Sequence, residues 1–171
     1  MTPELLPHID EHDNLIAIHP KETIKQQNLR HRVSLIIPKT TDNKFILALR
    51  AKDKFPHPNV WVCAVGGKVQ SHETYEQAAL REMQEEANIQ SKLKLIIPLS
   101  PFESEKEKYI AQIFTTTAEI PLHLLRPDPS EIQYFQSFSL SEAKTLITHH
   151  PEQFAPSFRI HFQRFIETYK S

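Results

Sequence analysis

Three glutamates, Glu82, Glu85 and Glu86, are spaced so that one helix would gather them on a single face. With about 100° per residue, positions i, i+3 and i+4 share an arc of roughly 100°. Like charges at this spacing destabilise a helix by roughly a few tenths of a kcal/mol per pair, so a cation should compensate them. Carboxylate oxygens suit hard divalent cations, and Mg²⁺ is typically held by a few carboxylates together with water and substrate phosphates. The spacing therefore indicates a magnesium site.

The segment 74–87 has the sequence signals of the helix that this site needs. Thr74, followed three residues later by Gln77, resembles a capping box at the start of a helix. Asn88 tolerates the left-handed conformation that commonly ends one. The apolar side chains that fall on one arc, and so predict the buried face, are Ala79, Leu80, Met83 and Ala87.

The helix follows the only two glycines of the 171-residue chain, the adjacent Gly66 and Gly67. Five residues separate Gly67 from Glu73, and seven more separate Glu73 from Arg81, which directly precedes Glu82. Arg81 could pair with Glu73 across the base of the helix and orient the carboxylates. A glutamate-rich helix is usually a solvated face, but six fixed positions match by chance roughly once in 10⁷ to 10⁸ starts. The spacing therefore favours a functional site.

Residues 67–89 resemble the Nudix box, which reads GX5EX7RE, an apolar residue, XEEXG and a second apolar residue. The one departure is Asn88, where the family usually has glycine. The resemblance implies an α/β fold, an α/β/α sandwich with a mixed β-sheet. We expect residues 1–171 to form a single domain of this kind, with an N-terminal extension over about residues 1–29.

The resemblance also implies a role for each residue of the motif. Glu82, Glu85 and Glu86 match the glutamates with which the family binds one to three Mg²⁺ or Mn²⁺ ions, and the carbonyl of Gly67 is a further candidate ligand. Such ions bridge phosphate oxygens and help to activate the water that attacks phosphorus. Glu82 is the first candidate for the general base. Glu131, at the start of a later strand, is the second, although an exposed residue at a strand edge explains it equally well.

The flanks of the box resemble one branch of the superfamily, isopentenyl-diphosphate isomerase and related hydrolases. The segments that carry this weaker resemblance are residues 10–18, 28–32, 58–61 and 154–156. The isomerase has a cysteine where this chain has Gly66, a histidine where it has Lys68, and a catalytic glutamate where it has Tyr109. The resemblance thus implies that this chain hydrolyses a diphosphate and does not isomerise one.

Two residue types raise alternative sites that the sequence does not favour. Cys63 lies three residues before Gly66, and an odd offset in a pleated strand would send its side chain to the opposite face as a buried apolar filler. The ten histidines, including His149 and His150, show no paired ligand spacing, so we expect them at the surface.

Arg50 and Lys54 are candidates for contacts with the substrate phosphates, because the isomerase branch has basic residues at the corresponding positions. Ordinary surface charges explain them about as well. The leading hypothesis is hydrolysis of a nucleoside diphosphate linked to another group, or of a similar small diphosphate. The alternatives are isopentenyl-diphosphate isomerisation, and a sensor that binds a nucleotide without turnover.

The remaining elements complete a mixed α/β pattern. Residues 31–37 and 45–50 indicate two strands joined as a hairpin, and the β-branched segment 60–65 indicates a third that ends at the glycines. Further strands are predicted at 92–97, 109–116 and 131–138, and further helices at 141–149 and about 156–169. The phenylalanines of the last helix are spaced for packing on a core.

Composition limits the possible partners. With 20 basic and 21 acidic residues, the chain lacks the basic field that binding to a nucleic-acid polymer requires. The chain has no apolar run of about 18 residues, so no membrane span is predicted. A single cysteine, and an N-terminus without the basic start of a secretory signal, favour the cytoplasm. We expect a monomer or a homodimer that acts on a small-molecule diphosphate.

Overall fold

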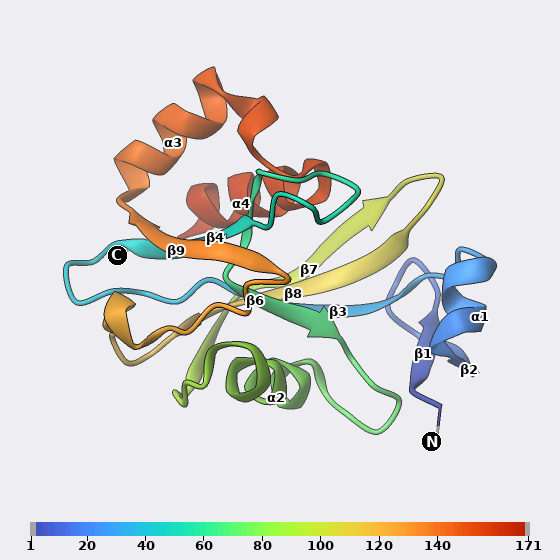
Figure 1. Cartoon of the computed structure of the whole chain (residues 1–171). Coiled ribbons are helices and arrows are strands. Elements are labelled where there is room, and N and C mark those ends of the chain that lie inside the picture. Colours follow the sequence, from blue (N-terminus) through green and yellow to red (C-terminus); the bar gives the residue numbers. More distant parts are fainter. Residues whose placement is uncertain (1–2, 170–171) are drawn as a thin grey trace.

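The computed structural model describes residues 3–169 and shows an α/β/α sandwich in which mixed sheets lie between α2 on one side and α3 and α4 on the other (Figure 1). The predicted fold class is confirmed. The strands are β1 (Leu5–Ile9), β2 (Leu15–Pro20), β3 (His31–Ile36), β4 (Phe45–Arg50), β5 (Trp61–Cys63), β6 (Val65–Lys68), β7 (Leu93–Glu103), β8 (Lys108–Thr116) and β9 (Ile132–Phe138). The helices are α1 (Lys21–Gln26), α2 (Tyr75–Ala87), α3 (Leu140–His149) and α4 (Pro156–Thr168), with 3₁₀ turns at Leu122–Leu124 and Pro151–Gln153.

Two sheets form the middle layer and bring the glycines next to α2. The first has the order β6-β3-β8-β7, with β3 and β8 parallel and the other neighbours antiparallel. The second is antiparallel, with the order β5-β4-β9. The buried Ser34 of β3 pairs with Gly67 of β6, and its hydroxyl donates a hydrogen bond of 2.6 Å to the carbonyl of Tyr75 in the first turn of α2. This bond fixes the start of the helix over the sheet.

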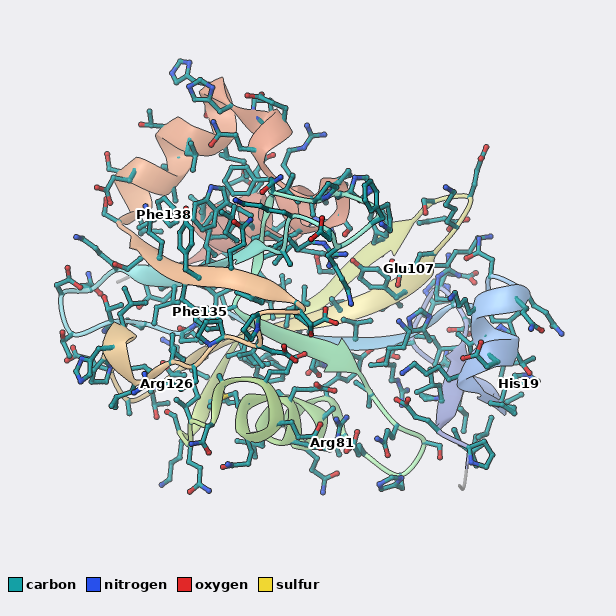
Figure 2. All side chains as sticks on the ribbon, viewed as in Figure 1. His19, Arg81, Glu107, Arg126, Phe135 and Phe138 are labelled. Atoms are coloured by element: carbon teal, nitrogen blue, oxygen red, sulfur yellow. The ribbon has the colours of Figure 1, made fainter. Side chains whose placement is uncertain are left out.

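Apolar residues from both faces of the sheets form two large cores and a small third cluster of Val33, Tyr109 and Ala111. One core lies under α2 and includes Ala79 and Met83, and the other lies under α3 and α4. Figure 2 shows the alternation along β9, where Phe138 points toward α3 and Phe135 toward the α2 side. The aromatic stripe of α4 is buried in the second core, as predicted. Within residues 3–169, no helix is both long and apolar enough to cross a membrane.

The signals at the ends of α2 are confirmed. Thr74 and Gln77 form both hydrogen bonds of a capping box, and Asn88 ends the helix in the left-handed conformation, with φ 52° and ψ 38°. The prediction for Leu80 was wrong, because this side chain is 42% exposed while its neighbours on the arc are buried. Leu80 lies at the edge of the apolar arc, where the helix turns away from the core.

The segment 60–65 is not one strand, which corrects the prediction for Cys63. The chain leaves the second sheet after Cys63, passes Ala64, and joins the first sheet at Val65. Because the strand is interrupted, the alternation of faces does not carry from Cys63 to Gly66. Cys63 is half-buried against the second core and also lines the main cavity, and its thiol donates to the carbonyl of Ile36 at 2.9 Å. Burial raises the pKa of this thiol to about 12.

The predicted hairpin of residues 31–37 and 45–50 exists only at its turn. Lys39 and Phe45 form an antiparallel bridge, and the amide of Thr40 donates to the carbonyl of Lys44 at 2.8 Å. Beyond the turn the strands separate, since β3 pairs with β6 and β8 while β4 pairs with β5 and β9. The sequence of each strand predicts its conformation but not its partner.

The N-terminal extension contains β1, β2 and α1, which the sequence patterns did not predict. A polar contact at the β1–β2 turn holds it against the rest of the molecule. Asp13 accepts from Arg32 at 2.7 Å and from the hydroxyl of Tyr75 at 3.1 Å, and the guanidinium of Arg32 also lies over the Tyr75 ring. Because Tyr75 opens α2, the extension is attached directly to the helix that carries the glutamates.

Candidate functional site

A cavity of about 920 Å³ opens between the two helical layers, and the glutamates of α2 form one of its walls. The loop before β9 forms a second wall, and the N-terminal half of α4 forms a third. The predicted site residues that line the cavity are Arg50, Gly67, Glu82, Glu85, Glu86 and Glu131. Segments far apart in the sequence therefore meet around the motif.

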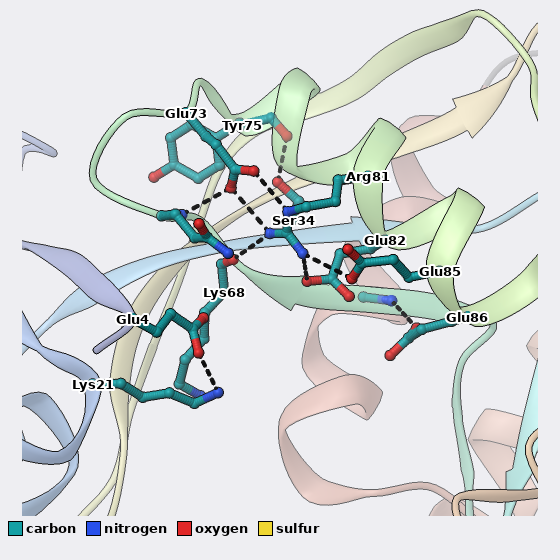
Figure 3. Close-up of polar contacts among 12 residues, drawn as sticks. Glu4, Lys21, Ser34, Lys68, Glu73, Tyr75, Arg81, Glu82, Glu85 and Glu86 are labelled. Atoms are coloured by element: carbon teal, nitrogen blue, oxygen red, sulfur yellow. Dashed lines mark hydrogen bonds and ion pairs between the residues drawn. The ribbon is translucent and has the colours of Figure 1, made fainter. Parts of the chain in front are cut away.

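Arg81 connects the carboxylates at the base of this cavity (Figure 3). Its Nε and Nη2 donate to the two oxygens of Glu73 at 2.7 and 3.0 Å, which confirms the predicted pair. Its Nη1 donates to Glu82 at 2.7 Å and to Glu85 at 3.2 Å. The hydrogen bonds from Arg81 hold the pKa of the Glu73 carboxyl below its usual value. One guanidinium thus contacts and orients three carboxylates and offsets part of their charge.

Gly67 is required by space and not by backbone conformation. A Cβ at this position would lie 2.1 Å from Oε1 of Glu82, a distance that no real contact allows. The backbone does not explain the residue, because neither Gly66 nor Gly67 has a positive φ. The carboxylate of Glu82 therefore lies directly over the Gly67 backbone, in a position that any other residue at 67 would deny it.

Glu86 faces the same cavity, where the charged form of its carboxyl group is unfavourable. Its carboxylate accepts a hydrogen bond of 3.2 Å from the amide of Gly66. Partial burial together with the nearby charges of Glu82, Glu131 and Glu85 raises the pKa of Glu86 to about 7, against the lowering effect of that bond. Burial also raises the pKa of Glu82, partly offset by Arg81. Part of the negative charge at this wall is therefore not compensated by protein groups.

The donor set fits a hard divalent cation in its chemistry. Glu82 and Glu86 supply carboxylate oxygens, and their raised pKa values indicate that a positive charge beside them would be stabilising. Among residues 3–169, no three His, Cys, Asp or Glu side chains already converge as a ligand group. Glu82 and Glu85 instead share Arg81, so this guanidinium occupies the charge-compensating role in the structure.

The remaining predicted site residues lie across the cavity from α2. Glu131 directly precedes β9 and forms an ion pair with Lys54, so these two residues act as a unit. Arg50 lines the cavity, and its guanidinium donates to the carbonyls of Lys54, Pro56 and His57. Arg50 therefore also braces the loop that carries Lys54, and Lys54 reaches the site through Glu131.

Several cavity residues had no signal in the sequence, because they come from segments far from the motif. Arg126 and Asp128 lie on the loop before β9, and Lys21 enters from the N-terminal extension with Glu4, to which it is paired at 2.7 Å. Their positions depend on tertiary packing and not on local spacing.

Two histidines contradict the prediction of a surface location. His31 is 3% exposed and His161 is fully buried. Burial lowers the pKa of each imidazole to about 4. His161 lies on the aromatic face of α4, where it contacts the hydroxyl of Tyr109 at 2.9 Å. The sequence prediction considered only metal-ligand spacing and so missed a histidine that is part of a hydrogen-bonded core.

Comparison with known proteins identifies similar folds and one family. The NUDIX domain model matches residues 29–158. An uncharacterised Nudix hydrolase of Pseudomonas aeruginosa is 26% identical over 144 residues, which are 84% of this chain and 85% of that protein. A prenyl-diphosphate phosphatase of Methanosarcina mazei is 24% identical over 155 residues, 91% of each chain. The crystal structure of DR0079 from Deinococcus radiodurans shares the fold, with a TM-score of 0.71 at 20% identity over 98% of this chain and 100% of that one.

The Gly67→Ala variant should remain folded but lose the binding of a divalent cation. Its new methyl group would collide with the flexible end of Glu82, so the carboxylate would move away while the backbone stays in place. We expect an unfolding free energy within about 1 kcal/mol of wild type and a loss of divalent-cation binding, measured by urea unfolding and by calorimetry. Gly66→Ala is the matched control, because its Cβ would meet the end of the Leu35 side chain at 2.9 Å and the Ser34 carbonyl at 3.2 Å but not Glu82. Equal cation binding by the two variants would contradict this account.

The Glu86→Gln variant should show whether the ionised carboxylate of Glu86 destabilises the fold. A carboxyl group whose pKa is higher in the folded state than in the unfolded chain stabilises the fold at low pH, and this contribution is lost as pH rises. For Glu86 the loss falls between pH 4.5 and about pH 7. In EDTA we therefore expect Glu86→Gln to gain stability over wild type as pH rises through this range, measured by urea unfolding at pH 4.5 and 8.

Stability must be compared between Glu86→Gln and wild type at each pH, because both proteins contain His31 and His161. These histidines have lowered pKa values, so they change stability in the opposite sense over part of the same pH range. Glu76→Gln, an exposed position in the first turn of α2, serves as the control. If the stability difference between Glu86→Gln and wild type does not change with pH, ionisation of Glu86 does not destabilise the fold and this account is wrong.

Proposed function

This chain belongs to the NUDIX domain family, and we propose that it is a Mg²⁺- or Mn²⁺-dependent pyrophosphohydrolase acting on a nucleoside diphosphate derivative or a similar small diphosphate. The observation that carries the proposal is the contact of Arg81 with Glu73, Glu82 and Glu85 beside the space left by Gly67. A purely solvated glutamate face would need neither the half-buried arginine contact nor the missing side chain.

The proposed roles follow from these positions. Glu82, Glu85, Glu86 and the carbonyl of Gly67 would hold the cation, which when bound supplies charge neutralisation at the phosphates and a more acidic water. Arg81 orients Glu82 and Glu85 while Glu73 holds the other side of its guanidinium. We propose Glu82 as the general base and Glu131 as the alternative, since both line the cavity and Glu131 lies close enough to raise the pKa of Glu86.

The phosphates would lie between α2 and the wall that contains Arg50. The Arg50 side chain is preorganised by the carbonyls of its loop, so it can meet an anion without much loss of rotamer entropy. Lys54 would act through Glu131, to which it is paired. This arrangement supports Arg50 as a direct phosphate contact and Lys54 as a group that positions Glu131.

The resemblance to the isomerase branch bears on the substrate and not on the reaction. The relative from Methanosarcina mazei is named a prenyl-diphosphate phosphatase, which places prenyl diphosphates among the compounds to be tested. Isomerisation is disfavoured, because the positions of its cysteine and glutamate hold Gly66 and the buried Tyr109, neither of which transfers protons to carbon. Formation of dimethylallyl diphosphate from isopentenyl diphosphate would overturn this conclusion.

We further propose that the chain acts as one domain in the cytoplasm, as a monomer or homodimer. The cavity supports the first point, because the N-terminal extension contributes Lys21 and Glu4 to the same walls as the motif. The single cysteine supports a reducing compartment.

Incubation with a panel of nucleoside diphosphate derivatives and prenyl diphosphates in Mg²⁺ should release phosphate or a monophosphate. Glu85→Gln should lower kcat/KM by roughly 10²- to 10³-fold, because it removes one charged ligand of the cation. The control Glu119→Gln, in an exposed loop, should leave the rate unchanged. The proposal fails if no compound is cleaved, or if Glu85→Gln cleaves as fast as wild type.

A further inference from the structure

A row of four hydrogen-bonding side chains, three of them buried, runs from α4 through β7 to the cavity. Arg164 Nη1 donates to Ser100 Oγ at 2.7 Å, and Ser100 Oγ lies 2.7 Å from His161 Nδ1. His161 Nε2 lies 2.9 Å from the hydroxyl of Tyr109, which lines the cavity together with His161. Ser100 and His161 are fully buried, and Tyr109 is 5% exposed. None of the roles assigned to the box requires this row.

The arginine gives the row a direction. A guanidinium has five donors and no acceptor, so Ser100 Oγ must accept from Arg164. The hydroxyl hydrogen of Ser100 is then free to be donated to His161 Nδ1. A neutral imidazole that accepts at Nδ1 carries its hydrogen on Nε2 and donates it to the oxygen of Tyr109.

The opposite direction is costly. If Nδ1 of His161 carried the hydrogen, the Ser100 hydroxyl would accept twice, and among the described residues no other acceptor is recorded for its hydrogen. An unsatisfied donor in a fully buried site carries the whole cost of its desolvation. A doubly protonated imidazole is also disfavoured, because burial and the nearby charge of Arg164 lower the pKa of His161 to about 4.

The hydrogen of Tyr109 is therefore left for a partner outside the row. Tyr109 lines the cavity, and among residues 3–169 no group accepts its hydroxyl hydrogen, so this hydrogen is available to a group in the cavity. The surrounding wall contains Val33, Leu35 and Phe158, which are unsuited to a charged phosphate, and the Lys68 ammonium in this wall is already paired with Glu107. A neutral group with a hydrogen-bond acceptor fits this combination.

We propose that Tyr109, held in this state by Arg164, Ser100 and His161, is a specificity residue that donates a hydrogen bond to an oxygen or nitrogen acceptor on the organic group attached to the diphosphate. The inference rests on the proposed function and narrows it. A pure hydrocarbon group would leave the donor unpaired in a closed site and should be disfavoured for that reason. A nucleoside or sugar carries acceptors and should be favoured.

The direction of these hydrogen bonds is given by the tautomer of His161, which can be measured without any substrate. Nitrogen-15 spectra of histidine-labelled protein at pH 7 distinguish the two neutral tautomers, and His161→Gln identifies the His161 signals by their loss, since Tyr109→Phe would also shift the neighbouring His31. We expect hydrogen on Nε2 in wild type, and in Ser100→Ala a loss of this single tautomer. Hydrogen on Nδ1 in wild type would overturn the inference, whatever the enzyme cleaves.

The role of Tyr109 is tested by selectivity, using ADP-ribose and geranyl diphosphate as probes. Tyr109→Phe should lower the ratio of kcat/KM for ADP-ribose to that for geranyl diphosphate by about fivefold to tenfold, because only the first compound loses a bond. A merely structural role would lower both rates equally and leave the ratio unchanged, which would overturn the inference. Preference of the wild type for geranyl diphosphate would do so as well.

Failure of the proposed function has a different signature. If wild type cleaves neither probe nor any compound of the panel, hydrolysis is wrong, and the same ratio is then read from thermal stabilisation by the two probes in Ca²⁺. Greater stabilisation of wild type by ADP-ribose, reduced in Tyr109→Phe, would support the inference. Equal stabilisation of wild type and variant would overturn it.

Discussion

The contact of Arg81 with Glu73, Glu82 and Glu85 is the interaction on which the rest of the site depends. Three glutamates on one helix face repel one another, and a planar guanidinium offsets part of this cost by lying between two of them, Glu82 and Glu85, and the carboxylate of Glu73. The fork of donors spans Glu73 on one side and the cavity carboxylates on the other, which a lysine ammonium could not do with fixed geometry. Glu86 lies outside this contact. Its charged form is therefore less well compensated, and its pKa is raised to about 7.

The architecture around Arg81 supplies space and enclosure. The chain changes sheets at Ala64, so that Gly67 reaches the edge of the first sheet under α2 and leaves room for Glu82. The loop before β9 and the start of α4 then close the cavity from the other side. One wall is acidic and suited to a cation with phosphates, while the wall of Tyr109 combines apolar side chains and the paired Lys68 and Glu107 with a directed donor. In the proposed function, the fold thus separates the chemistry of cleavage from the recognition of the attached group.

Local signals in the sequence were sufficient for the helix and for its carboxylates. Capping at Thr74, termination at Asn88 and a strict residue spacing all act within one or two turns. The interruption at Ala64, the strand partners and the N-terminal hairpin depend on contacts between distant segments, which no local pattern encodes. His161 was missed for the same reason, since its partners Ser100 and Tyr109 lie on two other elements of the fold. Spacing indicated the chemistry, and packing determined what surrounds it.

The most direct test of the central claim is an anomalous difference map from crystals of the protein soaked in MnCl₂ at pH 8. The account predicts a Mn²⁺ peak bonded to carboxylate oxygens of Glu82 and Glu86, at about 2.0–2.3 Å, with the contact from Arg81 to Glu73 intact. A peak bonded to Asp128 and Glu131 instead, or the lack of any peak at α2 in crystals that diffract well, would contradict it.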